Sequence, residues 1–195
     1  MVTSFRGRPG AALTVPLAAI AVAGCGYSRT PLPDTSTPVQ PHGFRTVSYP
    51  CGGLSFQAPT NWTTTSLEGQ LQGAVYSGPA VVSVWCYGRN ELPPADAASL
   101  AVAATQLVDA ARARDRTLEV IRAGPTRIGG APTVALDVIE RIGGQTRRVR
   151  SLHIFLRGAE LVLEEYAPVS AFHAIDHAVF SPLIHSVVLS RASTV

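Results

Sequence analysis

Histidine supplies the side chains in this sequence that are best suited to metal binding or proton transfer. His173 and His177 stand four residues apart in a segment with helical periodicity, which is the spacing of two zinc ligands on one helix face. The glutamate of the H-E-x-x-H motif is absent, and Asp176 is the only acidic residue between them. Both histidines and Asp176 lie away from the apolar stripe of this segment. We therefore expect them on its solvent-exposed face with no metal bound; the alternative is a metal-dependent enzyme.

His153 is the other candidate for catalysis. It stands between the apolar Leu152 and Ile154 in a segment that is typical of a strand. We expect a half-buried histidine that is hydrogen bonded and packs against a helix. The alternative is an envelope hydrolase in which His153 is the base.

The carboxylates do not form an evident acid–base pair. Glu164 and Glu165 are adjacent in a predicted strand, so their side chains point to opposite faces of the sheet. Asp137 and Glu140, three residues apart in another strand, are separated in the same way. No G-x-S-x-G elbow, P-loop or dinucleotide-binding glycine motif is present. We therefore predict no catalytic residue and no cofactor, which favours a binding protein.

The N-terminal segment has the order of an export signal. Arg6 and Arg8 precede an apolar run over residues 11–23, and no acidic residue comes before it. At 1.5 Å per residue such a run reaches only about 20 Å as a helix, which is short of a hydrocarbon core of about 30 Å. A permanent membrane-spanning helix is not expected here.

The end of this run resembles the lipobox of bacterial lipoproteins. The residues are Val22-Ala23-Gly24-Cys25, with Val22 where leucine is usual. The resemblance implies that residues 1–24 are a signal peptide, and that Cys25 receives a diacylglycerol and becomes the new N-terminus. Two acyl chains meet the condition for stable anchoring, whereas one chain binds only marginally. A non-lipidated secretory signal with a chance cysteine is the alternative.

The two remaining cysteines agree with export. Cys51 and Cys86 would be in a compartment where disulfides persist, and we expect a bridge between them. Such a bridge is worth roughly 3 to 4 kcal/mol in the chain-entropy model. Two buried free thiols, or one reactive thiol, are the alternatives.

Charge and composition after Cys25 give no case for nucleic-acid binding. Without Arg6 and Arg8 the 16 basic residues fall to 14, against 13 acidic residues, and the formal charge falls from +3 to +1. Residues 25–43 contain four prolines with serine and threonine, which is typical of an extended tether. Residues 44–195 are expected to form a single domain.

The domain is predicted to be α+β, with a mostly antiparallel sheet of about 6–7 strands, one long helix and a C-terminal helix. Ser170 is a candidate N-cap of the C-terminal helix, and Pro182 should interrupt that helix or begin another at Ser181. The expected strands are 52–59, 73–78, 80–88, 117–124, 131–144, 145–158 and 160–168, with a helix over 93–116 after the third strand.

Two stretches resemble the PsbP-like α/β/α sandwich domains, a group that includes actinobacterial lipoproteins of the LpqN and LpqT type. The resemblance covers about residues 48–190, and its motifs are mainly structural. Members are mostly binding or accessory proteins without a shared catalytic residue set. The residues that carry it are Phe56, Pro59 and Trp62 in the first stretch, and Tyr166, Pro168, Phe172, Phe180 and Ser186 in the second.

Two sets of side chains could form surfaces for binding. Arg147, Arg148 and Arg150 are expected on a solvated edge strand, where charge prevents aggregation; contact with anionic lipid head groups is the alternative. Four aromatic residues of the first strands are expected in the core, although an aromatic-lined cleft would give the same pattern. They are Trp62, Tyr76, Trp85 and Tyr87.

These features predict a protein anchored through Cys25 at the extracytoplasmic face of the cell membrane. Its expected role is non-enzymatic, as a binding or accessory protein with an envelope protein or lipid as partner. The rival is an envelope hydrolase or metal-dependent enzyme that uses His153 or His173 and His177. A lipid or hydrophobe carrier, which needs an apolar cavity, is the further alternative.

Overall fold

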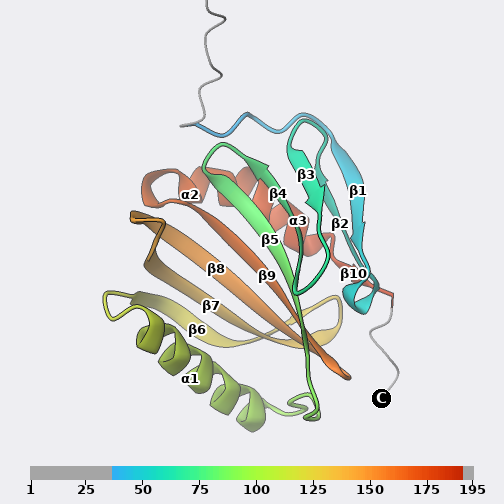
Figure 1. The fold of residues 1–195 in the computed structure, drawn as a ribbon, viewed down its shortest axis with the longest axis vertical. Helices are drawn as coiled ribbons and strands as arrows, with labels where there is room; N and C mark the ends of the chain where they lie inside the picture. The colour runs from blue at the N-terminus through green and yellow to red at the C-terminus, as the bar shows by residue number, and fades with distance from the viewer. Residues whose placement is uncertain (1–36, 191–195) are drawn as a thin grey trace, which may run out of the picture. The chain divides into compact units, whose positions relative to one another are not determined.

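A computed structural model describes residues 37–190, all of which belong to one compact unit. Two antiparallel sheets form its framework (Figure 1). The larger has seven strands in the order β3 (Thr63–Ser66), β4 (Leu71–Ser77), β5 (Ala80–Gly88), β9 (Ala159–Pro168), β8 (Gln145–Leu156), β7 (Ala131–Ile142) and β6 (Glu119–Ile128). The smaller has the order β1 (Phe44–Tyr49), β2 (Leu54–Pro59) and β10 (Val188–Leu189). The predicted α+β class and the mostly antiparallel sheet are confirmed.

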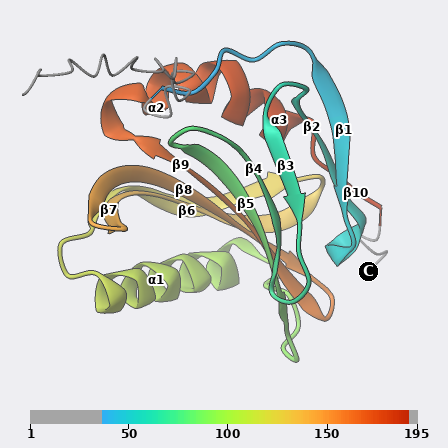
Figure 2. The same ribbon diagram turned by 45° about the horizontal axis from the view of Figure 1, so that its top comes forward.

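Helices cover the two faces of the large sheet (Figure 2). Helix α1 (Ala97–Arg114) packs on β6 and β7 on one face. On the other face lies the C-terminal helical segment, made of α2 (Val169–Ile175), the π-helical turn η2 (Asp176–Phe180) and α3 (Ser181–His185). The small sheet shares the core on that second face, where Phe56, Phe172 and Phe180 are fully buried.

Side chains of the central strands point alternately to the two faces of the large sheet and contribute to the hydrophobic core on each face. In β8, Leu152 and Ile154 face the core shared with α2 and the small sheet, whereas Val149 and Phe155 face the α1 side. Successive side chains of a strand point to opposite faces, so a strand with a layer on each side is apolar on both faces. This explains the nearly continuous apolar run at the end of β8.

Helix α1 begins with a capping box. The Ser99 backbone N–H donates to Asp96 Oδ1 at 2.7 Å, and the Asp96 backbone N–H donates to Ser99 Oγ at 3.3 Å. Arg112 and Arg114 stand in the last turn, where positive charge favours the helix dipole. The predicted range of 93–116 was therefore four residues early at its start and two late at its end.

The C-terminal helical segment differs from its prediction in one respect. Helix α2 begins at Val169 with Pro168 as N-cap residue, and no side-chain capping bond is made, so the assignment of Ser170 as N-cap was wrong. Pro168 lies just before the first turn with φ −53° and ψ 139°, a conformation that its fixed φ allows. The short helix predicted to begin at Ser181, with Pro182 in its first turn, is confirmed.

A disulfide joins the two sheets. Cys51, in the short 3₁₀ turn η1 (Cys51–Gly53) between β1 and β2, is bonded to Cys86 of β5, and their Cα atoms are 6.1 Å apart. This is the pairing expected from the cysteine count. Because β5 belongs to the large sheet, the bridge fixes one end of the small sheet to it.

Residues 37–43, at the end of the predicted tether, lie against the domain. The Val39 backbone N–H donates to Ser77 Oγ at 2.8 Å, and the indole N–H of the buried Trp62 donates to the Val39 carbonyl at 3.0 Å. Among the described residues, no helix is long and apolar enough to cross a membrane. Cys25 and residues 1–24 lie outside the described residues.

Candidate binding surface

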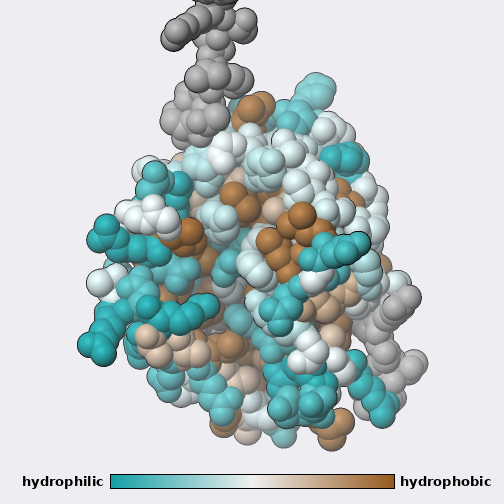
Figure 3. All heavy atoms as spheres, in the orientation of Figure 1, coloured by the Kyte–Doolittle hydropathy of each residue, from teal (hydrophilic) through white to brown (hydrophobic). Residues whose placement is uncertain are grey.

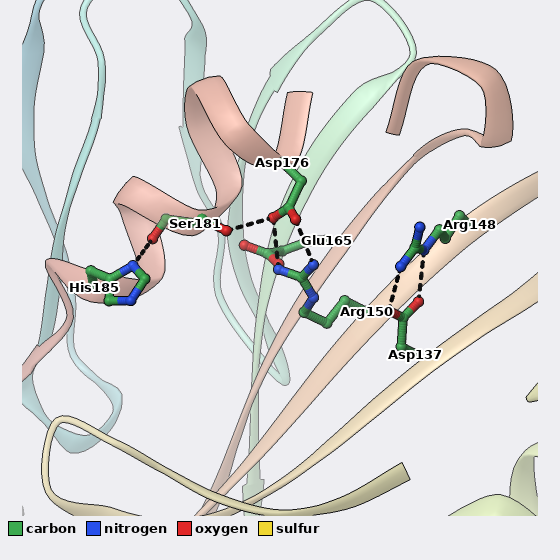
Figure 4. A network of polar contacts seen from close by, with 7 residues as sticks. All are labelled: Asp137, Arg148, Arg150, Glu165, Asp176, Ser181 and His185. Atoms are coloured by element: carbon green, nitrogen blue, oxygen red, sulfur yellow. Dashed lines mark hydrogen bonds and ion pairs between the residues drawn. The ribbon is translucent and has the colours of Figure 1, made fainter. Parts of the chain in front are cut away.

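Two arginines of β8 form the main polar network of the protein (Figure 4). Arg148 donates to Asp137 of β7 through Nε to Oδ1 at 2.9 Å and through Nη2 to Oδ2 at 2.7 Å. Arg150 holds both carboxylate oxygens of Asp176, at 2.8 and 2.9 Å. The expectation of a solvated edge strand was wrong, because β8 lies between β7 and β9 in the interior of the sheet.

Asp176 is turned toward the sheet and away from the two histidines beside it. Sequence reasoning placed Asp176 with His173 and His177 on the solvent face, and for Asp176 this was wrong. Asp176 is four residues after Phe172 and three before Val179, both buried, so ordinary helical spacing already places it beside the apolar stripe. The Ser181 hydroxyl also donates to Asp176 Oδ1, at 2.8 Å. Both histidines are exposed, as expected.

Glu165 is the most strongly perturbed carboxyl in this network. Its side chain is fully buried, and burial raises its pKa from the ordinary value of 4.5 to about 8, against the opposing effect of the Arg150 charge. Arg150 Nη1 lies 3.4 Å from Glu165 Oε2, and Glu165 Oε1 has no hydrogen-bond partner among the described residues. Burial therefore favours the protonated form of Glu165 in the folded protein.

Phe172 of α2 packs against both arginines. The guanidinium carbon of Arg148 lies 4.6 Å from the centre of its ring, and that of Arg150 lies 5.5 Å from it. Such cation–π contacts strengthen where the cation is shielded from water. The arginines of β8 therefore connect the sheet to the helical segment through both the ring and Asp176.

His153 has the environment expected from the sequence. It is half-buried on the α1 side of the sheet, with Nδ1 2.7 Å from Glu160 Oε1. Arg89 Nη1 donates to Glu160 Oε2 at 2.8 Å. Burial acts to raise the pKa of Glu160. The hydrogen bonds with His153 and Arg89 act in the opposite direction and hold this pKa below its usual value. His153, Glu160 and Arg89 form a structural cluster, with His153 held by a carboxylate.

The histidines proposed as catalytic or metal-binding are not brought together. His153 is on the α1 side of the large sheet, whereas His173 and His177 are on the helical segment that covers the opposite side. Within residues 37–190 no group of three or more potential ligands is placed to hold a metal ion. Nothing in the described part of the chain therefore supports a zinc centre built on these residues.

Among the described residues, no helix covers part of the large sheet on the α1 side. Helix α1 contacts β6 and β7, and Figure 1 looks onto the remaining strands β4, β5 and β9, with α2 and α3 behind them. We call this surface the open face. The register places on it Trp85 and Tyr87 of β5 and Glu164 and Tyr166 of β9, all half-buried, and Tyr76 of β4, which is 37% exposed.

The aromatic residues of the first strands thus divide between core and surface. Trp62 is in the core, as expected, but Trp85, Tyr87 and Tyr76 belong to the open face. The Trp85 and Tyr87 rings are stacked, with centroids 6.4 Å apart. Figure 3, in the same orientation as Figure 1, shows hydrophobic residues in separate patches among hydrophilic ones. The surface is thus mixed in character, as is usual for a non-obligate protein interface.

Two open pockets lie elsewhere. One, of about 310 Å³, is between α1 and β6 and includes Asp109 and Arg112. The other, of about 180 Å³, is between residues 37–41 and α2, and is lined mainly by alanine and other apolar residues. Neither is lined by a histidine.

Comparison with known proteins shows the fold. No protein-family model matches the chain, and no curated protein matches it either. Among solved structures, the cyanobacterial PsbP protein CyanoP from Synechocystis is similar, with a TM-score of 0.58 and 13% identity over 75% of this chain and 92% of that one. The described chain therefore has a PsbP-like fold.

Two further structures have this likeness. LpqN, described as involved in cell envelope biogenesis of Mycobacterium tuberculosis, has a TM-score of 0.51 and 16% identity over 78% of this chain and 88% of that one. The Ran-binding protein Mog1p of Saccharomyces cerevisiae has a TM-score of 0.50 and 13% identity over 75% of this chain and 95% of that one. At these identities the likeness concerns the fold and leaves function to be argued from the site.

Proposed function

We propose that this protein is a non-enzymatic binding or accessory protein of the bacterial cell envelope, held at the extracytoplasmic face of the membrane by a diacylglycerol on Cys25. The observation that carries the proposal is the pairing of its ionisable groups. Arg148, Arg150 and Arg89 are each bonded to a carboxylate, and His153 is held by Glu160. These contacts stabilise the fold. The Ser181 hydroxyl also donates to Asp176, but His185 Nδ1 contacts the Ser181 carbonyl oxygen and not its hydroxyl, so no histidine base is bonded to that hydroxyl among the described residues.

The fold comparison supports the same role. LpqN has a PsbP-like fold and is described as involved in cell envelope biogenesis, and CyanoP is a PsbP protein. Neither description names a catalytic activity. A binding role is also in agreement with the open face, where aromatic and polar side chains are presented on a rigid sheet without a helix above them.

Tethering would be the mechanism. Twelve residue steps separate Cys25 from Thr37, so the covalent chain limits the domain to within about 40 Å of its anchor. Confinement of this kind raises the effective concentration of the domain near partners in the same membrane. The domain would then bind an envelope partner at modest intrinsic affinity.

The carrier alternative is less well supported. A carrier must enclose an apolar ligand, and pockets for drug-sized ligands occupy about 300–1,000 Å³. The apolar pocket beside α2 has about 180 Å³, and the pocket between α1 and β6, of about 310 Å³, is open and is lined in part by Asp109 and Arg112. The core on that side of the sheet is filled by buried side chains such as Phe172, Phe180 and Leu183.

The anchoring proposal is tested on protein extracted from native membranes. Intact mass should show a chain that begins at Cys25 and carries acyl groups, and Cys25→Ala should leave the protein unprocessed or released from the membrane. Ser28→Ala, three residues away, is the matched control and should be processed normally. An unmodified terminus at another position would contradict the lipoprotein assignment.

A further inference from the structure

The open face has a row of small and polar side chains at its centre. Ala74, Ser83, Glu164 and Ser151 stand opposite one another on β4, β5, β9 and β8, and both serines are buried. The neighbouring row on one side contains Tyr76 and Tyr166. The neighbouring row on the other side contains Trp85. The Trp85 indole N–H donates to Ser83 Oγ at 2.9 Å, which places the Trp85 side chain against this row.

Glu164 is the only acidic residue in that row, and no cation balances it. The Ser151 hydroxyl donates to Glu164 Oε1 at 3.4 Å, and among the described residues no arginine or histidine lies within 4 Å of its carboxylate. By contrast, Glu160 on the same strand has an arginine partner, Arg89, at 2.8 Å. A half-buried carboxylate without an ion-pair partner keeps acceptor positions free for the paired N–H groups of a guanidinium.

The surroundings of Glu164 are aromatic and acidic. Its negative charge contributes to the raised pKa values of Tyr87, Tyr166 and Glu140, so these three groups from β5, β9 and β7 face the same region. The positive groups that act on them are Arg114 at the end of α1, which acts on Tyr87 and Glu140, and Arg147 of β8, which acts on Tyr166. Neither is bonded to Glu164.

We propose that the open face binds an arginine-bearing segment of a partner protein, with one guanidinium group placed over Glu164 between Trp85 and Tyr166. This inference rests on the proposed binding function. Arginine is favoured over lysine because its planar guanidinium pairs with a carboxylate through two parallel hydrogen bonds and stacks on aromatic rings. Diagonal neighbours on a sheet face are within reach of long and aromatic side chains, so Trp85 can contact a group bound to Glu164.

The shape of the surface favours a protein over a small cation. The two pockets described above lie at α1–β6 and beside α2, away from Glu164, and a small ligand needs enclosure to bind tightly. A peptide segment that crosses the strands would instead gain contacts along β4, β5 and β9. It would also cover the ring of Tyr76, which is exposed at one border.

The test measures binding of a defined peptide to the full mature protein in a non-ionic detergent. The probe is a seven-residue glycine peptide with arginine at alternate positions and a neutral fluorophore, and its affinity is measured by fluorescence anisotropy. A control peptide with glutamine in place of each arginine measures the binding that does not depend on the positive charge. Glu164→Gln removes the proposed partner charge, and Glu119→Gln, on an exposed position of β6, removes the same charge elsewhere.

We expect the arginine peptide to bind the wild type and to bind Glu164→Gln about tenfold more weakly or worse, as for loss of a hydrogen bond to a charged group. Glu119→Gln should change the affinity by less than about twofold, and the glutamine peptide should not bind. Circular-dichroism melting first shows that each variant is folded. Equal losses in the two variants, or no binding to the wild type, would overturn the inference. If Cys25 is lipidated and the protein is in the membrane, either result would reject arginine as the ligand. The proposal of a membrane-anchored binding protein would still stand.

Discussion

Arg150 Nη1 and Nη2 lie 2.8 and 2.9 Å from the two carboxylate oxygens of Asp176. This bidentate pair joins the central strand β8 to the π-helical turn, across 26 residues of sequence. It therefore fixes the position of the C-terminal helical segment on the sheet.

Loss of the Asp176 charge should destabilise the protein. Asp176→Asn leaves Arg150 with a weaker partner in a half-buried site, and we expect a loss of about 1 to 2 kcal/mol in the free energy of unfolding, because water partly screens the pair. His177→Ala, at the next and exposed position, is the matched control and should change stability by less than about 0.5 kcal/mol. Urea unfolding measures both. Equal stability of Asp176→Asn and wild type would show that the pair contributes nothing.

Glu165 should make stability fall as pH rises. Its pKa is about 8 in the folded protein, against an ordinary value of 4.5. Between these values the folded state keeps the proton that the unfolded chain releases, so the free energy of unfolding decreases with rising pH, by at most about 1.4 kcal/mol per pH unit. Glu165→Gln cannot ionise, so its stability relative to wild type should grow from about pH 4.5 to 8 and then level off. Thermal melts of both proteins across this range test it, and a pH-independent difference would contradict it.

The disulfide should contribute substantially to stability. Cys51→Ala and Cys86→Ala should each lower stability by about 3 to 4 kcal/mol, because each opens the loop that the bridge closes between residues 35 apart in sequence. The double variant should be no less stable than either single one, because both remove the same bond. Melting curves under non-reducing conditions compare the three. Additive losses in the double variant would mean that the cysteines act independently.

The exposed histidine pair should be dispensable. His173 and His177 lie on the solvent side of the helical segment, and no third ligand is placed beside them among residues 37–190. The double change to alanine should move stability by less than about 0.5 kcal/mol and leave any envelope phenotype intact. Metal analysis of the purified protein is the decisive check. Stoichiometric zinc in the wild type that is lost in the double variant would favour the metal-dependent alternative.

Local patterns predicted much of the fold. The strand over 80–88 is exact, and α1 and the strands β7, β8 and β9 lie within a few residues of their predicted ranges, because glycine turns and a change of hydrophobic period bound them. Strands β1, β3 and β10 were not predicted. β3 has the sequence Thr-Thr-Thr-Ser and no apolar alternation, so only its pairing with β4 makes it a strand.

The polar network could not be predicted in the same way. Sequence shows that Glu164 and Glu165 point to opposite faces, but not which face is buried, since that depends on where α2 packs. Asp176 was misplaced although helical spacing sets it beside Phe172, because the partner that accommodates its charge there, Arg150, is distant in sequence. Pairing of Arg148 with Asp137 depends on the order of strands in the sheet, which no local pattern encodes.

The central claim is that this domain acts by binding an envelope partner through its open face. The most direct measurement places a photoreactive amino acid at position 76, on that face, or at position 102, where Val102 is 57% exposed on α1, and irradiates living cells. We predict one discrete crosslinked species with an envelope protein from position 76 and none from position 102. No adduct from position 76, or the same adducts from both positions, would contradict the account.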